Sequence, residues 1–374
     1  MATQGKGSRR ERLNDFLAGD PDNLSLLADA ASAAFDERAF DQAADLLDRH
    51  ARLAPLTPAL LNLKGLIALA QQRFAEAAEI FGAVRAAGVD DPALRFNLAW
   101  SKAMTGSYGD ALALLDDAAL AVSARAPALK IQMMHHLEMY DEALAQGAAM
   151  AERFPDNHAL MGALATLALD AEKPELAQHY AARAGDNDEG QAALGVLALG
   201  AYDQPRALAL FDAALARQPR NARAWVGRGL GLLAGGDAAG GAQAIDRGAE
   251  LFGDHLGSWI ASGWAHFVEG DNAGARASFE RALALDDTFA ESHGGLAVMD
   301  ILDGRLDAAR RGADIALRLD RKCFGGALAK SLLLERSGHA ELAQKIRQIA
   351  LTTPIGPGGQ TILQAMAGFG IRRK

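Results

Sequence analysis

The sequence predicts an all-helical fold built from stacked pairs of antiparallel helices, because residues of one kind return at steps of 34 positions. Several such tracks share one register: Ala43, Ala77 and Ala111; Gly241, Ala275, Ala309 and Ala343; Gly195, Gly229 and Gly263; Gly236, Gly270, Gly304 and Gly338; and Trp225 with Trp259. A period of this length indicates an array of identical units in which each unit contacts only its neighbours. We therefore expect binding of a partner rather than catalysis.

Residues 222–251 show what one unit contains. Its first helix carries small and large apolar residues at i, i+4 and i+7, namely Trp225, Gly229 and Leu232. Gly235-Gly236 then ends that helix and Asp237 caps the next one. The inner face of the second helix carries Gly241, Ile245 and Gly248. Small residues at these points let the two helices of a pair cross closely.

Composition and charge exclude several classes of protein. Half of the residues are hydrophobic, so the chain can bury a core and is not disordered. The net charge is −9 and only the two ends are basic, which argues against a broad nucleic-acid surface. The single cysteine, Cys323, permits neither an intrachain disulfide nor a cysteine-based metal site. Neither a signal peptide nor a membrane span is evident, so we expect a cytoplasmic protein.

The repeating pattern resembles the tetratricopeptide repeat, a helix–turn–helix unit with a Leu-Gly pair followed by Ala, an aromatic residue, Ala and Pro. The clearest copy is Leu194-Gly195, Ala207, Phe211, Ala214 and Pro219. About ten repeats follow from this register, with expected starts at Leu24, Pro58, Pro92, Leu129, His158, Asp188, Ala222, Leu256, Ala290 and Phe324. Loops shorten around repeats four to six and Gln132–Met150 matches the pattern poorly, so we expect an irregular superhelical twist near there.

The register also predicts three parts of the chain. Residues 1–23 are expected to form a basic tail and an N-terminal capping helix, and residues 24–355 the array of helix pairs. Residues 356–374 follow as a Gly/Pro linker, an apolar segment at Thr361–Phe369 and a basic end. We expect this segment either to cap the last repeat or to fold back into the binding groove.

The resemblance implies a right-handed superhelical solenoid whose first helices line a concave groove, chiefly through the second, fifth, ninth and twelfth positions of each repeat. Those positions predict a partner-binding groove made of Leu66, Leu69, Phe96, Trp100, Val226, Leu230, Leu233, Ile260, Trp264, Phe267, Val298 and Ile301. Such an apolar groove suits an extended peptide or an amphipathic helix of another protein. If the register were displaced by one residue, the same side chains would be ordinary packing between helices.

Other motifs support no chemistry of their own. Some members of the resembled family grip a terminal carboxylate, but the basic residues needed beside Asn62 and Asn97 are missing. His135 and His136 are adjacent, so they point about 100° apart on a helix and cannot both bind one metal. The glycines at 227–231 lie within a predicted helix and follow no strand, unlike a dinucleotide loop. Cys323 is expected to be an inert thiol. The sequence thus predicts no catalytic residue, cofactor or metal.

Three functions remain open. The first is a non-catalytic adaptor or scaffold that binds another protein in its groove. The second is a component of a bacterial cell-envelope assembly, such as a pilus, secretion or polysaccharide apparatus. The third is an enzyme or its regulatory subunit, which would need an active site on the surface of the array. The partner, the pathway and the oligomeric state do not follow from the sequence.

Overall fold

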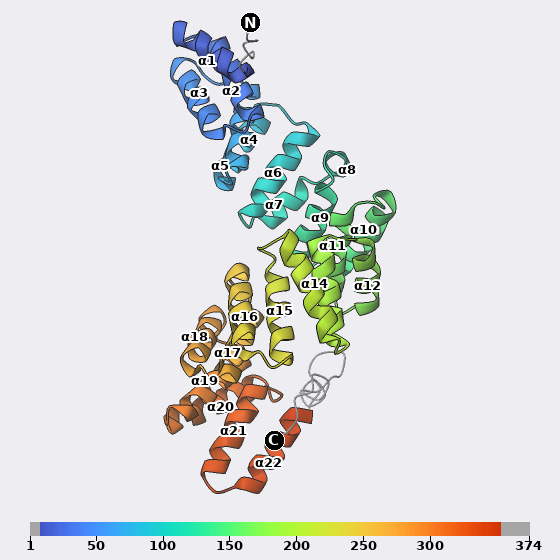
Figure 1. Cartoon of the computed structure of the whole chain (residues 1–374), viewed down its shortest axis with the longest axis vertical. Helices are drawn as coiled ribbons and strands as arrows, with labels where there is room; N and C mark the ends of the chain where they lie inside the picture. The colour runs from blue at the N-terminus through green and yellow to red at the C-terminus, as the bar shows by residue number, and fades with distance from the viewer. Residues whose placement is uncertain (1–7, 353–374) are drawn as a thin grey trace, which may run out of the picture. The chain divides into compact units, whose positions relative to one another are not determined.

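A computed structural model describes residues 8–352, and within that range every regular element is an α-helix (Figure 1). The predicted all-helical repeat fold is therefore confirmed. Contacts divide the chain into two bodies, Met1–Leu160 and Met161–Lys374.

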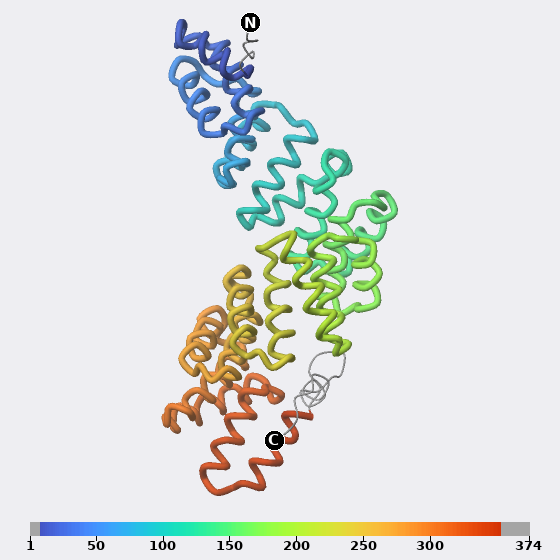
Figure 2. Tube along the Cα trace, in the orientation of Figure 1, coloured from blue at the N-terminus to red at the C-terminus, as the bar shows by residue number. Residues whose placement is uncertain are grey.

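The first body is a succession of helix pairs that follows an N-terminal helix (Figure 2). Its helices are α1 (Arg9–Gly19), α2 (Leu24–Asp36), α3 (Phe40–Leu53), α4 (Pro58–Ala70), α5 (Phe74–Ala86), α6 (Pro92–Met104), α7 (Tyr108–Ala113), α8 (Asp117–Leu120), α9 (Ala126–His136) and α10 (Tyr140–Arg153). Leu17 of α1 is buried in a cluster with residues of α2 and α3, so α1 covers the first pair.

The second body contains the remaining pairs, and α11 (His158–Asp170) begins just before its first residue. The other helices are α12 (Pro174–Arg183), α13 (Asp188–Gly200), α14 (Gln204–Arg217), α15 (Ala222–Ala234), α16 (Ala238–Phe252), α17 (Leu256–Glu269), α18 (Asn272–Leu285), α19 (Ala290–Leu302), α20 (Leu306–Leu319), α21 (Phe324–Arg336) and α22 (Ala340–Thr352). Nine of the ten predicted repeat starts are the first residue of a helix; only α9 begins three residues earlier than expected.

Buried aromatic rings explain Gly195 and Gly263 of the glycine track in the first helices, whereas Gly229 lies against Ile245 of its own pair. Phe81, Phe211 and Phe279 are fully buried on second helices. A Cβ added to Gly263 would lie 2.5 Å from Cε1 of Phe279, and one added to Gly295 of the next repeat would lie 2.6 Å from the same ring. The Phe279 ring therefore packs between the first helix of its own pair and that of the next pair, and both helices carry glycine there.

The turn within each pair explains a second track. Gly236, Gly270, Gly304 and Gly338 have φ angles of 89°, 93°, 76° and 84°, a left-handed backbone that glycine adopts without steric cost. The corresponding turns of earlier pairs keep the same geometry with larger residues, such as Gln72 at 59° and Glu172 at 58°. The turn conformation is thus constant, while glycine is used mainly in the later repeats.

The third pair has an irregularity that the sequence did not predict. Its second helix is interrupted, with α7 only six residues long and α8 only four. The side chain of Asp116 accepts a hydrogen bond from the Ala119 amide, which starts α8 as a separate helix. The poor match at Gln132–Met150 nevertheless contains a regular helix, α10.

Candidate functional site

The predicted groove residues fall on first helices of both bodies, where they differ widely in exposure. Leu66, Leu69, Phe96 and Trp100 of the first body are half-buried. In the second body Leu230 is exposed, while Val226, Leu233, Trp264 and Phe267 are half-buried. Ile260, Val298 and Ile301 are buried.

In the first body, the aromatic residues of α6 lie against each other and against an arginine. The ring centroids of Phe96 and Trp100 are 6.1 Å apart. The guanidinium of Arg125, the residue before α9, lies 5.7 Å from the centroid of Trp100. A cation over an indole face is an attractive contact, and it occupies one face of this ring.

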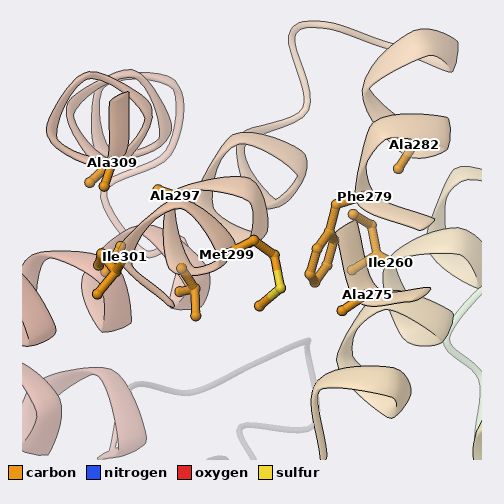
Figure 3. Packing of buried hydrophobic residues seen from close by; sticks show 11 residues of the cluster. Ile260, Ala275, Phe279, Ala282, Ala297, Met299, Ile301 and Ala309 are labelled. Atoms are coloured by element: carbon orange, nitrogen blue, oxygen red, sulfur yellow. The ribbon is translucent and has the colours of Figure 1, made fainter. Parts of the chain in front are cut away.

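The prediction that Ile260, Val298 and Ile301 line an open groove is wrong. All three belong to one core cluster, and Figure 3 shows Ile260 beside the Phe279 ring. Glycines let successive first helices approach closely here: a Cβ on Gly325 of α21 would lie 2.8 Å from the carbonyl carbon of Gly294 in α19. With backbones this close, side chains on the facing sides of the helices are covered.

Val226 and Leu233 pack within their own pair. A Cβ added to Gly248 of α16 would lie 2.5 Å from Cγ2 of Val226, and one added to Gly241 would lie 2.6 Å from Cγ of Leu233. For these two residues the interpretation as packing between helices is therefore the better one, since the glycines of α16 accommodate them.

Trp264 is held in an aromatic cluster rather than standing free. Its ring is edge-on to Phe267, Phe279 and Phe324, with centroids 5.6, 5.1 and 5.5 Å away. Its indole Nε1 donates a hydrogen bond to Oε1 of Glu291 at 3.1 Å. Trp264 thus connects α17 with α18, α19 and α21, and its main role in this structure is packing.

Glu291 is the centre of a polar network that was not predicted from the sequence. Its carboxylate accepts hydrogen bonds from the Gly325 amide at 3.0 Å, from Trp264 and from the thiol of Cys323, whose Sγ lies 3.0 Å from Oε2. Burial raises the pKa of Glu291, although these hydrogen bonds oppose the rise. The network joins α17 and α19 to the N-terminus of α21.

The same network disfavours the thiolate form of Cys323. The cysteine is buried at the N-terminus of α21, and its sulfur accepts a hydrogen bond from the Gly326 amide at 3.3 Å. Burial, followed by the neighbouring Glu291 carboxylate, raises the pKa of the thiol far above its usual value. This agrees with the expected inert thiol, because the nucleophilic form of cysteine is the thiolate.

On the first helices of the second body, the prediction missed two exposed large apolar residues. Val268 of α17 is 63% exposed and Leu302 of α19 is 43% exposed, as is Leu230 of α15. Val268 lies four residues after Trp264 and Leu302 four after Val298, so each continues the predicted stripe of its helix by one turn. We call Leu230, Val268 and Leu302 the exposed strip. The thirteenth residue of each of these first helices is Ala234, Val268 or Leu302, at steps of 34 residues. This recurrence is visible in the sequence and could have identified Val268 and Leu302.

Polar clusters elsewhere bridge neighbouring helices. Nε2 of His266 lies 2.9 Å from Oδ2 of Asp246, and the hydroxyl of Ser262 donates to the other carboxylate oxygen. The adjacent His135 and His136 pack against Tyr140 and Tyr108, respectively.

Within residues 8–352, histidine, cysteine, aspartate and glutamate form no group of three that could hold a metal ion. In that same range, no helix is both long and apolar enough to span a bilayer.

The family model of the tetratricopeptide repeat matches residues 62–129 and 192–255. A solved structure of an IFIT1 monomeric mutant with Gppp-AAAA is similar over 93% of this chain and 95% of that one, with 12% identity and a TM-score of 0.52. The hetero-tetramer of Cut9 and Hcn1 from the APC/C covers 92% of this chain and 87% of its own, with 13% identity and a TM-score of 0.47. The MamA protein covers 45% of this chain and 91% of its own, with 18% identity and a TM-score of 0.37. No curated protein matches the sequence.

Proposed function

Because the chain is a tetratricopeptide-repeat protein of about ten helix pairs, we propose that it is a non-catalytic adaptor that binds a segment of another protein on the faces of its first helices. Proteins built from these repeats bind other proteins, and the proposal concerns where and how this one does so.

The exposed strip carries this proposal. Leu230, Val268 and Leu302 present three large apolar side chains to solvent on three successive first helices of one body. Exposed apolar groups that recur along one face are typical of an interaction surface. Apolar side chains of an amphipathic helix or an extended peptide would cover them and gain the free energy of burial.

The first body offers a smaller surface of the same kind. Leu66 and Leu69 on α4 and the pair Phe96 and Trp100 on α6 are half-buried, so part of each side chain is open to a partner. We propose that Arg125 keeps the Trp100 ring in place for such a contact. The apolar character of both surfaces, together with the net charge of −9, favours a protein segment over a nucleic acid.

A pull-down with matched variants tests the proposal. Val268→Asp with Leu302→Asp places charge on the strip without touching the core, because both side chains are exposed. We expect this variant to lose a partner that the wild-type chain retains, while its circular dichroism is unchanged. The control is Leu319→Asp, which changes an equally exposed leucine at the end of the second helix α20. Retention of every partner by the strip variant would refute the assignment.

A further inference from the structure

The carboxylates along the exposed strip are neutralised at its Leu302 end. Asp300 and Asp303 are the acidic residues nearest to Leu302 in the chain. Each of them has two arginine partners at 2.7–2.9 Å, Arg276 of α18 and Arg305 of the turn after α19. Two permanent cations therefore balance two carboxylates at this end of the strip.

The carboxylates at the Val268 end have no permanent cation beside them. Oxygens of Glu269 and Asp271 lie 3.5 and 3.3 Å from Nδ1 of His266. Oδ2 of Asp246, on α16, lies 2.9 Å from Nε2 of the same ring. In residues 8–352, no lysine or arginine forms an ion pair with any of these three carboxylates. Three negative charges thus face at most the one positive charge of an imidazole.

Asp246 shows that this imbalance departs from the repeat pattern. In three other repeats, an aspartate at the ninth position of the second helix forms an ion pair with a cation 16 residues later, on the next first helix. These pairs are Asp48 with Lys64, Asp212 with Arg228, and Asp314 with Lys330. Sixteen residues after Asp246 the chain has Ser262, whose hydroxyl donates a hydrogen bond to the carboxylate but carries no charge. The α17 end of the strip therefore lacks a cation that equivalent contacts have.

Aspartates in the turns extend the negative surface along the strip. Asp203, Asp237 and Asp271 recur at steps of 34 residues as exposed N-caps of α14, α16 and α18, each in the turn after a first helix. The next step reaches Arg305, so the row ends where the carboxylates beside the strip are neutralised. The C-terminal ends of the first helices at these turns add partial negative charge. Around Val268 the surface is thus apolar and acidic side by side.

We propose that the exposed strip binds a basic amphipathic helix of another protein. This inference rests on the proposed function and adds the charge of the partner to it. Apolar side chains of such a helix cover Val268 and the rest of the strip, while a lysine or arginine on its flank meets Glu269 and Asp271. The cation of the partner does there what Arg276 and Arg305 do at the other end. A segment without cations would leave the carboxylates partly desolvated and unpaired, and an acidic segment would be repelled.

Fluorescence anisotropy of two synthetic helical peptides with the full-length chain tests the charge of the partner. The peptides carry the same leucine stripe, flanked by lysine in one and by glutamate in the other. We expect the lysine peptide to bind at least about ten-fold more tightly at low salt, and the difference to shrink in ~1 M salt, which screens exposed charges. Equal affinities would overturn this inference and leave the proposed function standing.

Removal of two carboxylates tests where the cation binds. Glu269→Gln with Asp271→Asn keeps the cap of α18, because asparagine caps a helix as well as aspartate does. This variant should bind the lysine peptide about ten-fold more weakly and the glutamate peptide no more weakly. The control Asp254→Asn with Asp287→Asn removes the same charge from exposed positions in the loops before α17 and α19, and it should retain the wild-type affinities. An equal loss in the two variants would contradict a local site for the cation.

Neutral substitutions test the apolar side of the site. Val268→Ser with Leu302→Ser should weaken the binding of both peptides, because the strip loses its two large side chains without a change in charge. Unchanged binding of the lysine peptide would place it elsewhere on the chain and overturn this inference, whereas the pull-down decides the proposed function separately.

Other occupants of the strip would give different results. A second copy of the chain would appear in sedimentation velocity as a dimer that Val268→Ser with Leu302→Ser dissociates. Thr361–Phe369, which the sequence predicts either to cap the array or to enter the groove, lies outside the described residues. If that segment fills the strip, the full-length chain will bind neither peptide. Either result would overturn the proposal.

Discussion

Two glycines on neighbouring helices of the first body allow a direct test of why small residues recur. Gly65 of α4 faces the buried ring of Phe81, and an added Cβ would lie 2.5 Å from Cε1 and 2.9 Å from both Cδ1 and Cζ. Gly82 of α5 has no atom within 4 Å of the corresponding position. The perturbation is therefore the same methyl group placed in a filled site and in an open one.

The expected magnitudes follow from two opposing effects. Alanine in place of glycine within a helix stabilises it by about 1 kcal/mol at either site. At Gly65 the methyl group also overpacks a core in which Phe81 has no free side, which costs about 1–3 kcal/mol. We expect Gly82→Ala to be stabilising by up to about 1 kcal/mol and Gly65→Ala to be less stable than Gly82→Ala by about 1–3 kcal/mol. Helix propensity cancels in that difference, which isolates the packing cost.

Native-state hydrogen exchange at buried amides of α4 and α5 measures the free energy of opening in this part of the chain. A cycle that adds Phe81→Leu should reduce the cost of Gly65→Ala, because the smaller side chain leaves room for the methyl group. If both alanine variants shifted the opening free energy equally, or if Phe81→Leu left the cost unchanged, the explanation of the repeat period by ring packing would be refuted.

Three other predictions concern turns, charge and the thiol. Gln72→Gly and Glu172→Gly should each stabilise the protein by about 0.5–1 kcal/mol in chemical denaturation, because a left-handed backbone costs a larger residue more than it costs glycine; the reverse change Gly270→Ala should destabilise it. Glu291 has a pKa raised above its usual value of 4.5, so the folded state binds its proton more tightly than the unfolded state. The associated stability is fully present below about pH 4.5 and is lost as the pH rises through the raised pKa, so melting temperatures of the wild type should fall with rising pH more steeply than those of Glu291→Gln. A thiol reagent should modify Cys323 only after unfolding in the wild type but faster in Glu291→Ala, and equal rates in the two proteins would contradict the role assigned to Glu291.

The helix pairs were predictable because their causes are local or strictly periodic. Asn221 and Asp237 cap α15 and α16 through hydrogen bonds that follow from residue type and position. The period located the starts of the first helices, since a glycine or an aromatic ring must recur wherever the same contact recurs. The break between α7 and α8 was not predicted, because the cap at Asp116 competes with a helix that the spacing alone favours.

The proposed binding surface was less predictable, because exposure depends on how closely neighbouring repeats approach. Val298 occupies the same repeat position as Leu230, yet one is fully buried and the other 43% exposed. The difference lies in other residues, chiefly Gly294 and Gly325, which bring α19 and α21 together. A register fixes the direction in which a side chain points, but only the packing of the next helix decides whether solvent reaches it.

The rings that pack between successive pairs have a consequence for how damage spreads. Phe279 is enclosed by Gly263 of its own pair and Gly295 of the next, and Phe211 is enclosed by Gly195 and Gly227 in the same way. Loosening one pair therefore uncovers an aromatic side chain of the pair before it, while the pair after it loses the ring that filled its glycine. Unfolding should thus spread along the array one repeat at a time. A deletion that ends between two pairs leaves an exposed aromatic surface, prone to association, at the new terminus.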